Sequence, residues 1–279
     1  GTGPLPTWEA SVRNLAENGF NAVVPNVVWG GVALYDSEYL PHASIVAERG
    51  DLLAECVDAA ARHGIEVHAV MDAWRNTGMV PEAFTRKLRE EGRLQKNFAG
   101  KEIGWLCPSD PRNFELKLNA VLEVVRNYDV DGIQFDFIRY PDRQSCYCDG
   151  CHERFERDIG LTVKNWPADT REDEAVRDAW VQWRCDQISR LVRASAEQVR
   201  AIDPHCKISA AVKRYYRKCR SERGQDWVYW IEQGWLDFVC PMNFTDTDLT
   251  YAAIVAPQVA HVAGRVPFYP STECSSRYP

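Results

Sequence analysis

The sequence lacks the features that mark several classes of protein. No apolar run approaches the roughly 20 residues that cross a membrane. No G-x-G-x-x-G motif follows a predicted strand, which argues against a doubly wound dinucleotide-binding fold and an organic cofactor of that kind. No long basic run is present and the net charge is −7, so nucleic acid is not an expected partner. The first residues have neither the charged nor the apolar region of a signal peptide.

The chain has 279 residues, 45% of them hydrophobic, which is enough for one large domain over residues 1–279. Strand-like and helix-like segments alternate along it. Helices are predicted over 7–18, 51–63, 113–128, 176–202, 227–233 and 249–262, and strands over 20–29, 65–71, around 136, and over 207–212, 236–243 and 266–269. This alternation predicts an α/β fold with a parallel sheet, of the TIM (β/α)8 barrel type.

The predicted barrel is incomplete. Only six strands are found, whereas a closed barrel of this type has eight. The chain opens on a helix and stops just after a strand, so we expect the first and eighth strands to lie outside it or in segments with no clear pattern. Long loops are expected at 73–110, with a short helix of its own near 81–91, and at 139–175.

One predicted strand carries a carboxylate where catalytic groups usually lie. Turn residues precede the strand, apolar residues fill it, and Pro141 ends it, while Asp136 lies near its C-terminal end. Because side chains alternate along a strand, Gln134 and Asp136 share one face. A buried carboxylate is costly unless it is paired, solvated or used. The C-terminal ends of barrel strands hold the active sites of such enzymes.

A cluster of cysteines predicts a metal site. Cys146, Cys148 and Cys151 lie within six residues, too close for unstrained disulfides among all three. A structural zinc ion takes four ligands in a tetrahedron, and four thiolates leave no open position. Cys107 is the expected fourth ligand, with His152 as the substitute, because its loop should emerge at the same end of the sheet. Disulfides in an exported protein, or free buried thiols, are the alternatives.

Glycoside hydrolysis needs two carboxyl groups. Asp136 is the first candidate, and Glu273 or Asp246 the candidate partner. An arginine as near as Arg139 would keep Asp136 ionised, as a nucleophile requires. Side chains at or after strand ends are expected to contact substrate, with packing roles as the alternative; they are Trp29, Tyr35, His68, Asp72, Trp74, Arg139, Tyr140 and Asn243.

These residues resemble a known family. The segment DGIQFDFIRYP at 131–141 is similar to a signature of the family 10 glycosyl-hydrolase-like proteins, bacterial TIM-barrel enzymes. Further similar segments are GFNAV at 19–23, ALYDS at 33–37, GIEVHA at 64–69, PSDP at 108–111 and LDFVCPMN at 236–243. The resemblance implies cleavage of glycosidic bonds in a polysaccharide or cell-wall glycan. Many relatives carry a second acid where this chain has Phe137. Separately, the cysteine spacing is similar to the zinc site of family 42 β-galactosidases, which supports Cys107 as the fourth ligand.

The sequence therefore favours a glycoside hydrolase with Asp136 in a cleft and a carbohydrate as substrate. A non-catalytic carbohydrate-binding barrel is the alternative. A metal-dependent hydrolase is disfavoured, because no pair of histidines with ligand spacing follows a strand. The compartment and oligomeric state stay open: thiolate-bound zinc tolerates the cytosol, whereas the resemblance favours export.

Overall fold

A computed structural model describes residues 7–245 and 247–272. Its centre is a parallel sheet in the order β2 (Asn26–Trp29), β4 (Glu66–Asp72), β7 (Gly132–Asp136), β8 (Lys207–Lys213) and β9 (Phe238–Met242). The short β1 (Ala22–Val23) also pairs with β4, and β3 (Val32–Ala33) forms an antiparallel hairpin with β2. Parallel bridges join β9 to Phe268 and Ser271. Five of the six predicted strand regions are therefore confirmed, whereas the region 266–269 forms only an isolated bridge at Phe268. Within the described residues, the sheet does not close on itself.

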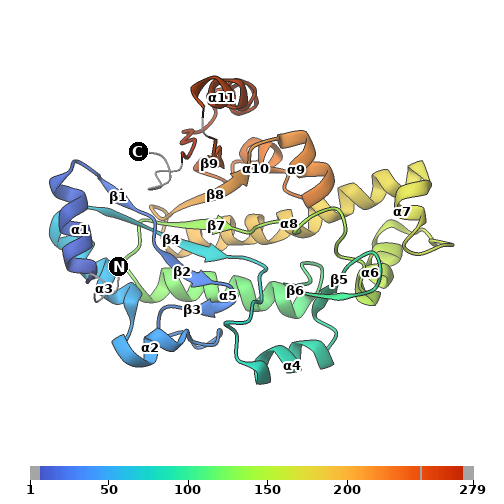
Figure 1. The fold of residues 1–279 in the computed structure, drawn as a ribbon, viewed down its shortest axis with the longest axis horizontal. Coiled ribbons are helices and arrows are strands. Elements are labelled where there is room, and N and C mark those ends of the chain that lie inside the picture. The colour runs from blue at the N-terminus through green and yellow to red at the C-terminus, as the bar shows by residue number, and fades with distance from the viewer. Residues whose placement is uncertain (1–6, 246, 273–279) are drawn as a thin grey trace.

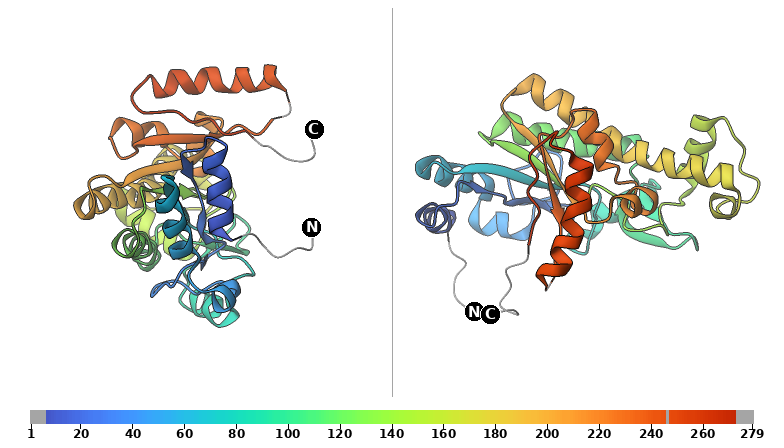
Figure 2. Two further views of the ribbon diagram at one scale, coloured as in Figure 1. Left: turned by 90° about the vertical axis from the view of Figure 1, so that its left-hand side faces the viewer. Right: turned by 90° about the horizontal axis from the view of Figure 1, so that it is seen from above.

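Helices cover the outer face of this sheet, as Figures 1 and 2 show. They are α1 (Trp8–Glu17), α3 (Leu52–His63), α5 (Pro111–Asn127), α8 (Glu174–Ile202), α10 (Trp227–Glu232) and α11 (Asp248–Val262). Local signals fix their ends. The carboxylate of Asp51 accepts hydrogen bonds from two backbone amides in the first turn of α3, and Gly64 ends that helix in a left-handed conformation. The helix predictions agree with these bounds to within about two residues.

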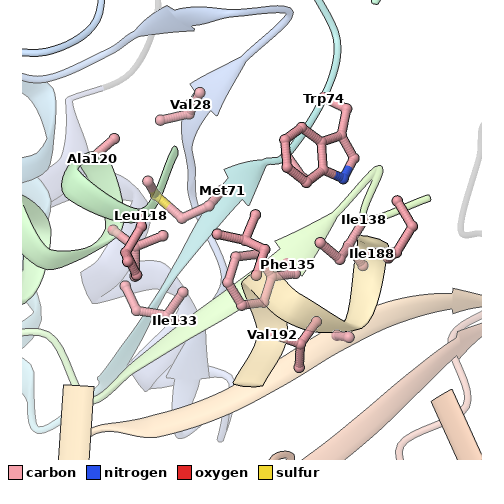
Figure 3. Packing of buried hydrophobic residues seen from close by; sticks show 14 of the residues in the cluster. Val28, Met71, Trp74, Leu118, Ala120, Ile133, Phe135, Ile138, Ile188 and Val192 are labelled. Atoms are coloured by element: carbon pink, nitrogen blue, oxygen red, sulfur yellow. The ribbon is translucent and has the colours of Figure 1, made fainter. Parts of the chain in front are cut away.

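The core lies between the sheet and these helices. Met71 of β4 and Ile133 and Phe135 of β7 point toward α5 and α8, where they meet Leu118 and Ile188 (Figure 3). The pairing register aligns Val70 with Gln134 and Met71 with Phe135. One set of alternate residues in each strand therefore packs against helices, and the other set, which includes Asp72 and Asp136, faces the concave side.

The two long insertions contain more structure than the sequence predicts. The segment 73–110 holds α4 (Glu82–Glu90), which confirms the short helix expected near 81–91, and an unpredicted hairpin of β5 (Leu94–Lys96) and β6 (Glu102–Leu106). The segment 139–175 holds α6 (Asp149–Ile159) and α7 (Asp169–Glu172), and α2 (Ser44–Arg49) and α9 (Tyr216–Arg223) were also missed. These elements are short and rich in charge, so their apolar pattern is weak. Figure 1 places β5, β6, α6 and α7 beyond the C-terminal ends of the strands.

A buried lysine lies in the helical layer behind β4. Lys117 of α5 is 4% exposed, and its Nζ donates a hydrogen bond to the backbone oxygen of Asp72 at 3.2 Å. Burial lowers the pKa of Lys117 to about 8. Lys117 therefore connects α5 to the end of β4, and its buried position destabilises the charged form of its amino group.

This lysine should give the protein a pH-dependent stability. In the unfolded chain the pKa of lysine is about 10.4. Between pH 8 and that value the unfolded state binds more protons, so the contribution of Lys117 to the free energy of unfolding increases as the pH rises. We expect the free energy of unfolding of the wild type to rise by up to about 3 kcal/mol relative to that of Lys117→Met across this window. Urea unfolding at several pH values measures it, with the exposed Lys101→Met as control. An unchanged difference would contradict the assignment.

Candidate active site

Two aspartates lie side by side at the C-terminal edge of the sheet. Asp72 ends β4 and Asp136 ends β7, and the parallel pairing makes them direct register partners. The backbone amide of Ala73 donates to the carbonyl oxygen of Asp136 at 2.9 Å, which extends this pairing by one residue. The structure therefore brings together the two carboxylates that the sequence placed at neighbouring strand ends.

The carboxylate of Asp136 is partly open to solvent. Its side chain is 19% exposed. Oδ1 accepts a hydrogen bond from the backbone amide of Phe137 at 2.6 Å, and Nη1 of Arg139 lies 3.4 Å away. Phe137 has a φ of +49°, a left-handed conformation that is unfavourable for an aromatic residue. Such strain is found at functional sites, where the surrounding structure maintains it.

Asp72, by contrast, is fully engaged by the protein. Its Oδ2 accepts hydrogen bonds from the amide of Gly30 at 2.8 Å and from Nε of Arg75 at 2.6 Å. The guanidinium of Arg75 lies against two aromatic rings, 4.0 Å from the centre of Trp29 and 3.6 Å from that of Phe137. Asp72 therefore positions Arg75, and Arg75 supports the strained residue next to Asp136.

Cations gather around Asp136. Lys213 ends the neighbouring strand β8, and Arg139 is almost completely buried. The pKa of Lys213 is lowered by burial and then by repulsion from Arg139 and Arg223, while attraction to Asp136 opposes this shift. Burial also lowers the pKa of Arg139. The edge of the sheet near Asp136 is therefore positively charged.

A hollow of about 640 Å³, a volume in the range of small-ligand sites, is lined by residues of the two insertions, and Asp136 is not among them. Trp105 of β6 forms part of its wall and meets the ring of Phe137 edge-on at 5.8 Å. Other lining residues are Asn76, Asn97, Pro141, Asp142 and Gln144. Amide side chains beside an aromatic ring suit the hydroxyl groups and apolar faces of a sugar.

Three aromatic residues predicted to contact substrate are instead packed in the core. Tyr35, Trp74 and Tyr140 have no exposed surface, so they offer no ring face to a sugar as packed here. Tyr35 donates a hydrogen bond to the buried carboxylate of Glu123 at 2.9 Å, and the guanidinium of Arg184 covers the ring of Tyr140 at 4.3 Å. Trp29 is half-buried beneath Arg75.

Two other predicted residues, His68 and Asn243, are buried and bonded within the protein. His68 is buried on the concave face of β4; a Cβ atom at Gly132 would lie 2.3 Å from its Nδ1, so glycine makes room for the ring. Asn243 is fully buried and exchanges hydrogen bonds of 2.7 and 2.9 Å with Gln258 of α11. Asp246 and Glu273 lie outside the described residues.

The structure brings the four predicted cysteines together. Cys107, Cys146, Cys148 and Cys151 are buried, and their sulfur atoms all lie within 4.8 Å of one another. The Sγ atom of Cys107 is 3.3 Å from that of Cys151 and 3.7 Å from that of Cys148, too far for the about 2.05 Å of a disulfide. His152 is not part of the cluster, because its ring stacks on Trp166. The predicted ligand set is therefore assembled.

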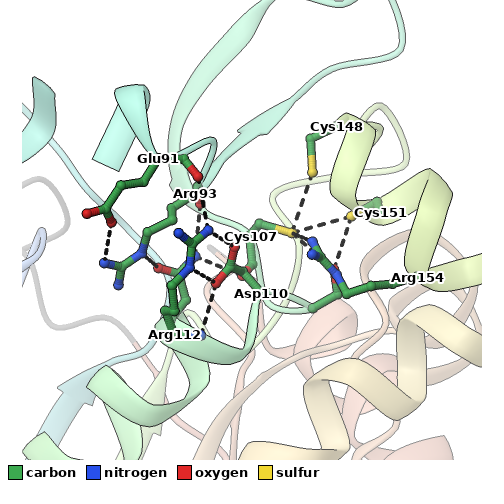
Figure 4. A network of polar contacts seen from close by, with 10 residues as sticks. Glu91, Arg93, Cys107, Asp110, Arg112, Cys148, Cys151 and Arg154 are labelled. Carbon is green, nitrogen blue, oxygen red and sulfur yellow. Dashed lines mark hydrogen bonds and ion pairs between the residues drawn. The ribbon is translucent and has the colours of Figure 1, made fainter. Parts of the chain in front are cut away.

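Basic and polar groups surround these thiols (Figure 4). Nη2 of Arg154 lies 3.7 Å from the sulfur of Cys107, and its Nε donates a hydrogen bond to Ser109 at 3.0 Å. Hydrogen bonds from the other three thiols and the charge of Arg154 hold the pKa of Cys107 well below its usual range. Burial raises the pKa of Cys146 and of Cys151, so the pocket stabilises negative charge on the sulfur of Cys107 but not on these two.

Sequence reasoning missed several residues of this site. The cations of the site are Arg75, Arg139, Lys213 and Arg223. Only Arg139 was predicted from the sequence. Arg75 could have been found, since it lies three residues after a strand-end aspartate. Trp105 and Arg223 belong to elements that the sequence did not predict, so no pattern placed them near Asp136.

The chain is similar to glycosyl hydrolases over most of its length. A family model described as glycosyl hydrolase-like 10 matches residues 7–260. Glycosyl hydrolase YngK of Bacillus subtilis is 21% identical over 264 residues, which cover 84% of this chain and 48% of that protein. Glycosyl hydrolase DigH of Escherichia coli (strain K12) is 22% identical, with 83% and 56% covered. The chain spans about half the length of these curated relatives.

Solved structures with the same fold are also glycoside hydrolases. The PgaB (BpsB) glycoside hydrolase domain from Bordetella bronchiseptica has a TM-score of 0.75 at 14% identity, covering 94% of this chain and 77% of that one. The family 42 β-galactosidase Gan42B from G. stearothermophilus has a TM-score of 0.59 at 13% identity, with 89% and 39% covered. The predicted barrel-type α/β fold is confirmed.

Among the described helices, none has the length and apolar character needed to cross a membrane.

The left-handed conformation of Phe137 gives a test of the site's backbone. Replacing Phe137 with glycine removes the ring but relieves the φ strain, whereas alanine removes the ring and keeps the strain. We expect Phe137→Gly to be about 1 kcal/mol more stable than Phe137→Ala in urea unfolding. At Phe135, in the extended strand, the order should reverse, with glycine the less stable. The same order at both positions would contradict the assigned conformation.

Proposed function

We propose that this chain, which belongs to the glycosyl hydrolase-like 10 family, is a glycoside hydrolase with Asp136 as a reacting carboxylate. The supporting observation is the contrast between the two aspartates at the strand ends. Asp72 is buried and bound on Oδ2 by Gly30 and Arg75, whereas Asp136 is 19% exposed beside a cationic edge. Of these two, Asp136 is the one that a ligand can reach.

The environment of Asp136 fits a nucleophile or a base. Its Oδ1 is fixed by the amide of Phe137, and Arg139 provides a cationic neighbour. Fixed donors on one oxygen orient a carboxylate and leave its other oxygen for the reaction. The general acid that hydrolysis also needs is not Asp72 in this arrangement. Asp246 and Glu273 remain the candidate acids.

A non-catalytic carbohydrate-binding barrel is the second candidate function. The observation that favours it is that Phe137, and not a second acid, follows Asp136, so one accessible carboxylate stands alone among the described ends of the parallel strands. In that case Asp136 would hydrogen-bond to a sugar hydroxyl group, and binding would occur without cleavage.

We also propose that the four cysteines hold a structural zinc ion. In a tetrahedron with Zn–S bonds of about 2.3 Å, neighbouring sulfur atoms lie about 3.8 Å apart. The two separations given above, 3.3 and 3.7 Å, are close to that value. Four thiolate ligands leave no open position, so this site would connect the loop before α5 to the loop before α6 and would take no part in the reaction.

Asp136→Asn tests the proposed reaction. The substitution keeps the shape of the side chain but removes its charge, so folding should be unchanged while release of reducing ends from a panel of bacterial and plant glycans falls about 10²–10⁴-fold. The control is Asp129→Asn, because Asp129 is exposed at the opposite end of β7. Undiminished turnover in Asp136→Asn would reject the assignment. Binding of a glycan by the wild type without cleavage would support the carbohydrate-binding barrel.

Metal analysis tests the zinc site. Protein purified without chelators should contain about one zinc ion per chain, and Cys148→Ser should lower both the zinc content and the melting temperature, the latter by roughly 5–10 °C. The matched control is Cys206→Ser, since Cys206 is also buried but lies at the start of β8, outside the cluster. Equal losses in both variants, or no zinc in the wild type, would refute the proposal.

A further inference from the structure

We propose that the glycan bound by this protein is negatively charged, and that the segment 213–223 binds it. This inference rests on the proposed function for the position of the reacting carboxylate. It names a property of the ligand, its charge, that neither the fold nor the family determines.

The first observation is the local charge balance. Residues 213–223, KRYYRKCRSER, contain six lysines and arginines and a single acid, Glu222. The whole chain has 33 basic and 40 acidic residues. An excess of five positive charges within eleven residues therefore opposes the charge of the rest of the protein. Helix α9 forms most of this segment.

The second observation is the position of the segment. It begins at Lys213, the last residue of β8, and so continues directly from the edge of the sheet that holds Asp136. Lys213 and Arg223 are near enough to Arg139 and Asp136 to influence one another electrostatically. A ligand that reaches Asp136 from this side passes these cations. In Figure 1, α9 lies above the C-terminal ends of β7 and β8.

The third observation is that most of these cations have no acidic partner. Arg220 forms an ion pair with Asp226 at 2.9 Å. Among the described residues, the other five form no ion pair, and Arg217 and Lys218 are exposed. Tyr215 is 56% exposed, with the guanidinium of Arg214 5.8 Å from its ring centre. Exposed cations next to an open aromatic ring suit the carboxylate groups and apolar faces of acidic sugars.

The fourth observation extends the basic surface. A second hollow, of about 440 Å³, lies against α9 and is lined by Ser221 and Glu222 together with Arg143, Arg171, Arg177 and Arg184. Tyr147 and Trp180 complete its aromatic wall. Arg177 is partly neutralised by Glu174 and Asp178, at 3.8 and 3.7 Å. This hollow therefore places further arginines next to α9, where a chain-like polyanion would find additional cationic contacts.

Binding measurements with Asp136→Asn test the inference, because this variant should retain substrate without cleaving it. The probes are hexagalacturonate, neutral cellohexaose and a single-stranded DNA 12-mer. We expect hexagalacturonate to bind about tenfold or more tightly than cellohexaose in 50 mM salt, and this preference to shrink as salt increases. Adding Arg217→Glu and Lys218→Glu should remove the preference. The matched control is Arg86→Glu with Lys87→Glu, the same charge change at adjacent exposed positions on α4, which should retain it.

The outcomes separate this inference from the proposed function. Equal, salt-independent binding of the acidic and neutral sugars, or equal effects of the two double variants, would overturn the inference. Tighter binding of DNA than of hexagalacturonate would also overturn it, in favour of nucleic acid. Rapid cleavage of neutral glycans by the wild type, with no preference for acidic ones, would overturn the inference and leave the hydrolase proposal standing. Acidic-sugar binding through α9, with no cleavage of any glycan, would support the inference and count against the hydrolase.

Discussion

The in-register pairing of β4 with β7 is the constraint on which the rest of the site depends. It aligns Asp72 with Asp136 and gives the two carboxylates different environments. The carboxylate of Asp72 receives donors from Gly30 and Arg75. Arg75 in turn supports the ring of Phe137, whose backbone amide fixes Asp136. A shift of either strand by one residue would move its own carboxylate to the helical face and break this chain of contacts.

Buried charged side chains elsewhere also fix local structure, because they hydrogen-bond to loops and so hold these loops against the helices. The carboxylate of Glu123 accepts hydrogen bonds from Tyr35, Ser37 and the amide of Glu38, and so ties the loop after β3 to α5. One nitrogen of Arg184 donates to the backbone oxygens of Asp142, Ser145 and Glu222. A buried charge costs free energy unless it is hydrogen-bonded, so the bonds that these groups make favour one arrangement of each loop.

The sequence was a good guide to regular structure and a poorer guide to side-chain environment. Strands and helices with clear apolar periodicity were found, because burial on one face leaves a pattern that can be read locally. The hairpin of β5 and β6 was missed, since its few residues alternate weakly. The cysteine cluster was predicted because thiolate ligands require close spacing. Tyr35 and Trp74 were expected near substrate, but whether a ring after a strand faces solvent or core is set by distant residues, such as Glu123.

The walls of the hollow beside Phe137 have a consequence for how this protein could diverge from its relatives. The lining comes from residues 76–78, from 97 and 103–105, and from 141, 142, 144 and 145, all of which lie in the two insertions and none in a strand of the parallel sheet. Exchange of these segments between homologues would therefore change the lining of the hollow while it preserved the parallel sheet and Asp136. The same insertions carry the four clustered cysteines, so an exchange that leaves folding intact must keep these cysteines in place.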